Sequence, residues 1–157
     1  MYPSDVLNSL DIPGLPQHRL VLKEGVPVML MRNMNPPKLC NGTRLIISKL
    51  SDYIIEAVIL TGPGAGEKTF IPRIPLAPSD HPIPFKRLQF PLRVCFAMTI
   101  NKSQGQSLKV AGVLLESPCF SHGQLYVAAS RVGKKESLFI YAPDGKTRNI
   151  VYPAALL

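Results

Sequence analysis

The stretch from Arg93 to Ala142 constrains the fold more than any other part of the chain, because strand-like and helix-like patterns alternate along it. Arg93–Ile100 is an apolar run rich in β-branched and aromatic residues, which is typical of a buried strand. After a polar turn at 101–105, Lys109–Glu116 and Ser137–Ala142 repeat the strand pattern, with a helix expected between them. This order of strands and short helices predicts a parallel sheet with right-handed crossovers.

The expected helix lies in Ser121–Val132. Ser121 and Gln124 have the spacing of a capping box, in which side chains satisfy free N–H groups at a helix start. Gly133 is placed to end the helix, and Gln124 and Arg131, seven residues apart, are expected on one face. A buried apolar stripe is expected from residues at i, i+3, i+4 and i+7, namely Leu125, Ala128, Ala129 and Val132.

Arg131 is then a lone guanidinium on a rigid scaffold, which suits the charge that forms on a γ-phosphate during phosphoryl transfer. A surface arginine on an ordinary helix fits this segment as well. Upstream, Thr99–Ser107 (TINKSQGQS) is expected at the carboxyl end of a strand, where ligands gather in parallel sheets. Spacing alone does not decide whether this turn and Arg131 face the same ligand.

Before Arg93 the pattern is all-β. Short runs rich in β-branched residues are separated by turn residues such as Asn41-Gly42, which predicts a small β-barrel. Pro72–Pro91 is too proline-dense for a helix and is expected to form an extended strap. A barrel that only packs against its neighbour fits this half of the chain equally well.

Gly62–Thr69 looks like a phosphate-binding loop, but Glu67 stands where that motif needs glycine before the lysine. The residues after Thr69 also do not open a helix, so a hairpin turn is expected here. We find no other lysine loop of the Walker type and no acidic strand end suited to Mg²⁺ in the sequence. The chain alone is therefore not expected to hydrolyse ATP.

The formal charge of +8 favours a polyanionic partner. The three cysteines and three histidines form no ligand cluster, so no metal site is expected, and the cysteine usage suggests a reducing compartment. No apolar run is long enough to span a membrane, and the first residues do not resemble a signal peptide. An intracellular protein without a membrane partner is expected.

TINKSQGQS and GQLYVAASRV resemble the fifth and sixth motifs of the PIF-type superfamily-one DNA helicases. LFIYAPDGKTRNIVYP, LPQHRLVLKEGVPVMLMRN and LCNGTRLI extend the resemblance, which is nearest to the Helitron-transposon branch and covers Leu15–Leu157. It implies an N-terminal tail at 1–14 and a barrel of the Src-homology-three type at 15–92, with the strap. It also implies that 93–157 is the C-terminal part of the second RecA-like motor domain.

By this resemblance, Arg131 is the arginine finger that reaches ATP on the first motor domain, and Gln104, Gly105 and Gln124 face the nucleotide. Thr99, Asn101 and Lys102 match positions that contact the phosphodiester backbone of single-stranded DNA, although relatives often carry histidine where this chain has Asn101. ATP and Mg²⁺ would be bound mainly by the first RecA-like domain, the partner that lies outside this chain. In the alternative interpretation, Lys102 and Ser103 merely cap a helix.

The resemblance implies the C-terminal portion of an ATP-dependent 5′-to-3′ DNA helicase, nuclear and concerned with DNA repair or recombination, that is an enzyme only at full length. Two other hypotheses remain open at this point. One is a non-enzymatic nucleic-acid-binding remnant of a transposon helicase gene, and the other is a β-barrel interaction module. A Walker lysine loop upstream of Met1 would favour the helicase.

Overall fold

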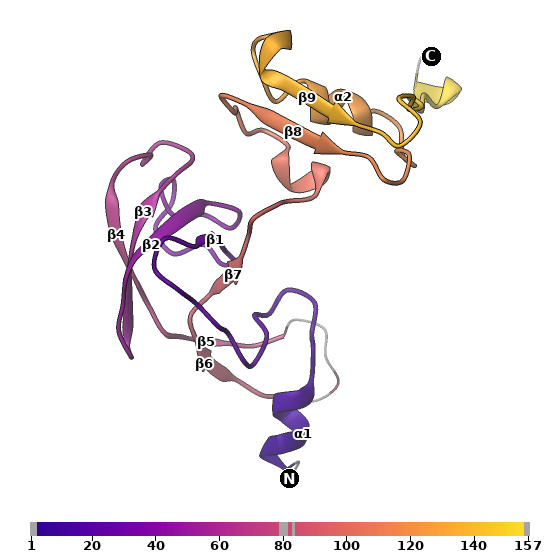
Figure 1. Cartoon of the computed structure of the whole chain (residues 1–157). Coiled ribbons are helices and arrows are strands. Elements are labelled where there is room, and N and C mark those ends of the chain that lie inside the picture. The colour runs from indigo at the N-terminus through magenta and orange to yellow at the C-terminus, as the bar shows by residue number, and fades with distance from the viewer. Residues whose placement is uncertain (1–2, 79–81, 83, 156–157) are drawn as a thin grey trace. The chain divides into compact units, whose positions relative to one another are not determined.

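The computed structural model of the chain describes residues 3–78, 82 and 84–155, and it divides into two compact units, Met1–Phe96 and Ala97–Leu157 (Figure 1). The expected domain bounds at 15–92 and 93–157 stay a prediction.

The first unit is built on a five-stranded antiparallel sheet in the order β4-β3-β2-β1-β7 (Figure 1). Its strands form where β-branched residues alternate with polar ones, because alternate side chains then enter one core. In the second strand, for example, Leu45 and Ile47 are buried while Arg44 and Ile46 are only half-buried. The strands are β1 (Pro27–Leu30), β2 (Arg44–Leu50), β3 (Ile54–Ile59), β4 (Lys68–Pro72) and β7 (Leu92–Val94).

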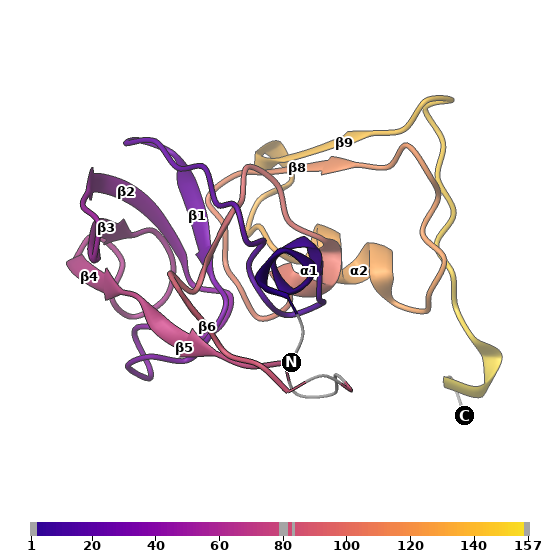
Figure 2. The same ribbon diagram turned by 90° about the horizontal axis from the view of Figure 1, so that it is seen from below.

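The expected proline-rich strap contains a second small sheet, the antiparallel pair β5 (Ile74–Leu76) and β6 (Arg87–Gln89), shown in Figure 2. Arg73 alone separates β5 from β4, and Phe90 and Pro91 separate β6 from β7, so this hairpin continues both edge strands of the larger sheet. Within the described residues the five-stranded sheet stays open. The predicted all-β character of this half is confirmed, but the predicted closed barrel of the Src-homology-three type is not.

One apolar cluster holds the first unit together. Leu30, Leu45 and Ile55 are completely buried, and they come from three neighbouring strands. Burying side chains of this size contributes roughly 1.5–3 kcal/mol each before the cost of ordering them. The cluster consists of Val28, Leu30, Leu39, Leu45, Ile47, Ile55, Ala57, Ile59, Ile71, Phe90 and Leu92. A six-residue helix, α1 (Ser4–Ser9), lies before this core in the predicted tail.

The predicted hairpin at Gly62–Thr69 is confirmed. The segment joins β3 to β4, and the Gly66 N–H donates to the Ile59 carbonyl at 2.8 Å. Lys68 lies in β4 and pairs with Glu56 across the strands at 3.1 Å, while Glu67 pairs with Lys38 at 2.8 Å. This lysine is therefore part of an antiparallel ladder and does not stand at the start of a helix.

The predicted strand at Arg93–Ile100 is wrong in its extent and its partners. Only Leu92–Val94 forms a strand, β7, and it pairs antiparallel with β1 in the first unit. Leu92 is completely buried there, whereas the Phe96 side chain is 74% exposed. Arg93 and Val94, at the start of the apolar run, pair with β1, and a 3₁₀ helix begins at Ile100.

The second unit contains one parallel strand pair, β8 (Ala111–Leu114) and β9 (Leu138–Tyr141), in which Ala111 lies opposite Leu138. The expected parallel sheet is thus present with two strands of the three predicted. Helix α2 (Gln124–Ala129) connects them and lies on one side of the pair in both ribbon views (Figures 1 and 2). Three short 3₁₀ helices complete the described part of this unit: η1 (Ile100–Ser103), η2 (Lys135–Ser137) and η3 (Pro153–Ala155).

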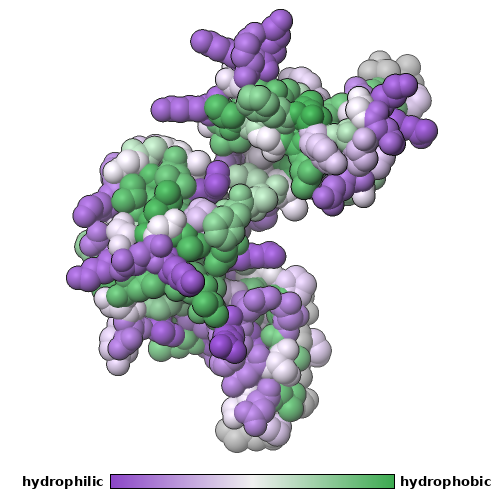
Figure 3. Space-filling view, in the orientation of Figure 1, coloured by the Kyte–Doolittle hydropathy of each residue, from purple (hydrophilic) through white to green (hydrophobic). Residues whose placement is uncertain are grey.

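The face of β8 and β9 turned away from α2 is apolar and exposed. Figure 3 shows hydrophobic residues gathered over these two strands. Leu114, Phe139 and Tyr141 are each more than half exposed, and Ile140 is exposed as well, whereas Val113 and Leu138 are half-buried.

Candidate functional site

The predicted polar turn is a tight 3₁₀ helix, η1. The N–H groups of Lys102 and Ser103 both donate to the Thr99 carbonyl, at 3.0 and 3.3 Å. The Ser103 hydroxyl turns inward and donates to the Ile100 carbonyl at 2.7 Å, so Ser103 is buried and does not cap a helix. Thr99, Asn101 and Lys102, the residues predicted to contact DNA, are all exposed on this turn.

Gln104 and Gly105, predicted to sense the nucleotide, follow η1 directly and are exposed as well. The Gln104 N–H donates to the Asn101 carbonyl at 3.3 Å and ends the 3₁₀ helix. Gly105 then has a φ of +76°, a conformation that a residue with a side chain rarely adopts. The side-chain amide of Gln106 donates from Nε2 to the Lys102 main-chain carbonyl at 2.9 Å. Hydrogen bonds therefore close the turn on both sides of Gly105.

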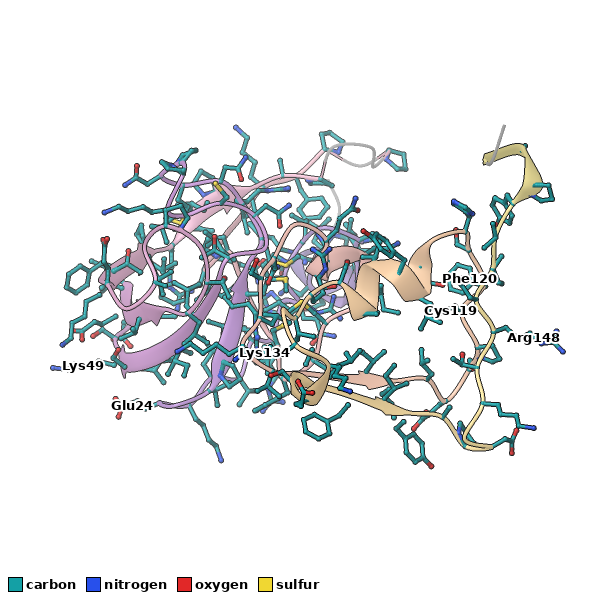
Figure 4. All side chains as sticks on the ribbon, turned by 90° about the horizontal axis from the view of Figure 1, so that it is seen from above. Glu24, Lys49, Cys119, Phe120, Lys134 and Arg148 are labelled. Atoms are coloured by element: carbon teal, nitrogen blue, oxygen red, sulfur yellow. The ribbon has the colours of Figure 1, made fainter. Side chains whose placement is uncertain are left out.

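Helix α2 is shorter than predicted, and its capping box does not form. It begins at Gln124, after Gly123 with a φ of 69°, and no side chain caps its N-terminus. Instead the side-chain oxygen Oε1 of Gln124 accepts a hydrogen bond from the backbone N–H of Phe120 at 3.0 Å. This bond holds the segment that leads into the helix, in which Figure 4 labels Cys119 and Phe120. A left-handed glycine next to the helix start thus replaces the hydroxyl cap expected at Ser121.

The far end of α2 also differs from the prediction. The helix ends at Ala129, with Ser130 as its C-cap, so Gly133 does not end it and Val132 lies outside it. Ala128 is the buried residue of the predicted stripe, while Leu125 is half-buried. Arg131 follows the helix, and the prediction that it shares a helical face with Gln124 is wrong.

Arg131 is nevertheless held rigidly. Its Nε donates to the Val127 carbonyl at 2.7 Å and its Nη2 donates to the Ser130 hydroxyl at 2.7 Å. Its Nη1 reaches across to the turn and donates to the Gln106 carbonyl at 3.2 Å and to the Ser103 carbonyl at 3.4 Å. In addition, the Leu108 N–H donates to the Arg131 carbonyl at 2.8 Å.

The structure therefore brings the two sequence motifs together. The carbonyls bound by Arg131 Nη1 belong to Ser103 and Gln106, the residues on either side of Gln104 and Gly105. All four acceptors of the guanidinium are neutral, so the side chain keeps an uncompensated positive charge beside an exposed polar turn. Such a site suits a phosphate oxygen.

Sequence reasoning missed the residues that hold Arg131. Three of its four acceptors are main-chain carbonyls, which every residue possesses, so no residue type at Ser103, Gln106 or Val127 signals the contact. The hydroxyl of Ser130, directly before the arginine, is the one partner that the sequence displays.

The described residues contain no group of three or more histidine, cysteine, aspartate or glutamate side chains arranged to hold a metal ion. Cys40 is half-buried, and Cys95 and Cys119 are buried. Among the helices that the structure describes, none is long and apolar enough to cross a membrane.

Known proteins resemble this chain over most of its length. A protein-family model described as "DNA helicase Pif1, 2B domain" matches residues 5–50. The chain is 31% identical to ATP-dependent DNA helicase PIF6 of Trypanosoma brucei brucei, over 82% of the chain and 17% of that protein. It is also 31% identical to ATP-dependent DNA helicase PIF1 of Xenopus laevis, over 82% of the chain and 20% of that protein.

A solved structure shares the fold. The crystal structure of Pif1 helicase from Bacteroides in complex with ADP-AlF3 and ssDNA matches with a TM-score of 0.67 and 27% identity, covering 87% of this chain and 33% of that one. The chain thus spans no more than about a third of each of these proteins.

Proposed function

Because this chain belongs to the PIF-type family of superfamily-one DNA helicases, we propose that it is the C-terminal portion of an ATP-dependent 5′-to-3′ DNA helicase. The observation that carries the proposal is the exposed turn Thr99–Gly105 fastened to Arg131. This arrangement puts a side chain suited to a nucleotide and side chains suited to DNA on one small piece of structure.

Arg131 is proposed as the arginine finger. A guanidinium that neutral acceptors orient retains its full charge for a γ-phosphate on a neighbouring motor domain. The hydrogen bonds from Nε and Nη2 fix the guanidinium beside the end of α2. Little side-chain entropy therefore remains to be lost when Arg131 contacts a nucleotide. Gln104, Gly105 and Gln124 are proposed to face the same nucleotide.

The exposed side chains of Thr99, Asn101 and Lys102 are proposed to contact the sugar-phosphate backbone of a single strand. A hydroxyl, an amide and an ammonium group can all donate to phosphate oxygens, and such contacts position a strand without reading its sequence. The Bacteroides relative was solved with single-stranded DNA, which supports this partner. The bonds from Arg131 to Ser103 and Gln106 would then couple the nucleotide to the strand.

ATP and Mg²⁺ would be held mainly by the first RecA-like domain, which we place outside this chain. The described residues supply no cluster of metal ligands, and the lysine of the loop-like segment Gly62–Thr69 pairs with a carboxylate instead. What this chain can supply to the bound nucleotide is the Arg131 guanidinium and the amide groups of the turn. A nuclear location, a role in DNA repair or recombination, and membership of the Helitron branch belong to the same proposal.

The proposal is tested by measuring how the chain binds a fluorescent oligothymidylate at several salt concentrations. Binding should be weak and should fall steeply as salt rises, because phosphate contacts release counterions. Lys102→Ala should lower the affinity and reduce the slope of log K against log salt by roughly 0.7, the loss of about one contact to a single strand. Lys146→Ala removes an equal charge from an exposed turn after β9 and serves as the control.

The two variants should differ. If both weaken binding equally, the charge of the whole chain and not the turn attracts DNA. If the chain does not bind at low salt, the DNA contact is absent and the interaction-module hypothesis gains.

A further inference from the structure

The first unit contains a basic cavity of about 780 Å³ that the proposed helicase function does not use. It lies between β6, the end of β2 and the segment 18–22. Arginine and lysine side chains line it, and no aspartate or glutamate is among its lining residues. The cations are Arg19, Arg73, Lys86 and Arg87, and His18 lies beside them.

Arg87 is the unusual member of this set, because its side chain is only 8% exposed. Its Nη2 donates to the carbonyls of Leu7 and Leu10 at the end of α1, the second at 3.0 Å, and its guanidinium carbon lies 5.1 Å from the centre of the Phe85 ring. Its Nε and Nη1 are buried and have no hydrogen-bond partner in the described part of the chain. No carboxylate that the structure describes neutralises this buried charge.

Gln89 lies two residues along β6 and points to the same side, because alternate residues of a strand share a face. Its amide nitrogen donates to the carbonyls of Gln17 and His18 at 3.0 and 3.3 Å, which holds that segment over the cavity. Its buried Oε1 has no partner either. This oxygen only accepts hydrogen bonds, so an anion does not satisfy it, and the Arg87 guanidinium is the group at this cavity that lacks a counter-ion.

Buried polar groups are normally satisfied, and a buried charge without a counter-ion is costly. We propose that this cavity binds a phosphate group, whose negative charge offsets the unpaired positive charge of Arg87. Arg19 and Lys86 are exposed at the cavity and contact the phosphate directly. Arg87 lies beneath the cavity surface and attracts the anion through its unscreened charge.

The phosphate can come from a free anion such as a nucleotide or from the backbone of a nucleic acid strand. The inference does not depend on the turn at Thr99–Gly105, since every residue of the cavity belongs to the first unit. Loss of DNA binding in Lys102→Ala would therefore leave this site intact.

The test uses the whole chain labelled with ¹⁵N and titrated separately with inorganic phosphate, adenosine monophosphate and a short oligothymidylate. Backbone amide signals of residues 86–90 and 17–19 should shift on titration. The double variant Arg19→Gln, Lys86→Gln should weaken the binding that these signals report by roughly tenfold or more, because two charge-assisted contacts are lost. Arg32→Gln, Lys23→Gln removes the same charges outside the cavity lining and should bind as the unaltered chain does.

The three ligands separate the two sources. If these signals report that the oligothymidylate binds at least tenfold more tightly than inorganic phosphate, the site binds a nucleic acid strand. If all three ligands bind with similar affinity, the site binds a free anion. No shift of these signals with any ligand at millimolar concentration would overturn the proposal. So would equal weakening in both double variants, provided that the amide spectra show both to be folded.

Discussion

Replacing Arg131 with alanine should loosen the turn at 103–108 while leaving the first unit unchanged. The substitution removes four hydrogen bonds, of which the two at 2.7 Å anchor the side chain and the two at 3.2 and 3.4 Å reach the turn. A hydrogen bond made by a charged group contributes about 1.5–3 kcal/mol when buried. Since Arg131 is only half-buried and its contacts with the turn are long, we expect a local loss of roughly 1–2 kcal/mol.

Amide hydrogen exchange followed by NMR measures this loss directly. The amides of Gln106, which donates to Ser103, and Leu108, which donates to Arg131, should exchange roughly 5- to 30-fold faster in Arg131→Ala. Lys102→Ala is the matched control, because that side chain is exposed on the same turn, and it should change these rates less than about twofold.

Two results would refute this reasoning. Unchanged exchange at Gln106 and Leu108 would show that the guanidinium does not hold the turn. Equal acceleration at core amides of the first unit, such as that of Leu45, would show that the substitution acts on the whole chain.

Two further predictions concern the first unit. Leu45→Ala in the completely buried core should lower the free energy of unfolding by about 2–5 kcal/mol in urea titrations, whereas Ile46→Ala on the half-buried side of the same strand should lower it by less; equal effects would contradict the assigned register of β2. The isolated chain should show no ATPase activity, and Lys68→Ala, which breaks a partly exposed ion pair with Glu56, should change its stability by less than about 1 kcal/mol; turnover that disappears with Lys68 would mean that the hairpin binds phosphate.

The strands of the first unit were largely predictable, because alternating β-branched runs bounded by turn residues leave few alternatives. The same reasoning failed at Arg93–Ile100. An apolar run indicates that its residues are buried, but it does not indicate which strands they pack against. Here Leu92–Val94 pairs with the edge of β1. The limits of α2 differ from the prediction because the left-handed Gly123, and not the Ser121 hydroxyl, precedes the first turn of the helix.

The candidate site was predictable only in its residue types. Thr99, Asn101 and Lys102 are exposed on one turn, which the polar composition of that segment favours. The contacts that join this turn to Arg131 are made to main-chain carbonyls, which carry no signature in the sequence. Partners of this kind follow from the path of the backbone, so they emerge only with the fold.

If Arg131 acts on a nucleotide, ATP turnover should depend on its guanidinium. In a polypeptide that joins this chain to a phosphate-binding first motor domain, Arg131→Ala should reduce turnover by roughly 10³-fold or more while nucleotide affinity changes far less. Arg131→Lys should not restore turnover, because an ammonium group cannot reproduce the planar fork of the guanidinium.

Because the Ser130 hydroxyl anchors the Arg131 side chain, Ser130→Ala is the control for a loss of anchoring. It removes the partner of Nη2 but keeps the guanidinium, so turnover should stay within roughly tenfold of the unaltered protein. We expect a large loss of turnover in Arg131→Ala and a small one in Ser130→Ala. Near-normal turnover in Arg131→Ala, with the fold intact by circular dichroism, would contradict this expectation.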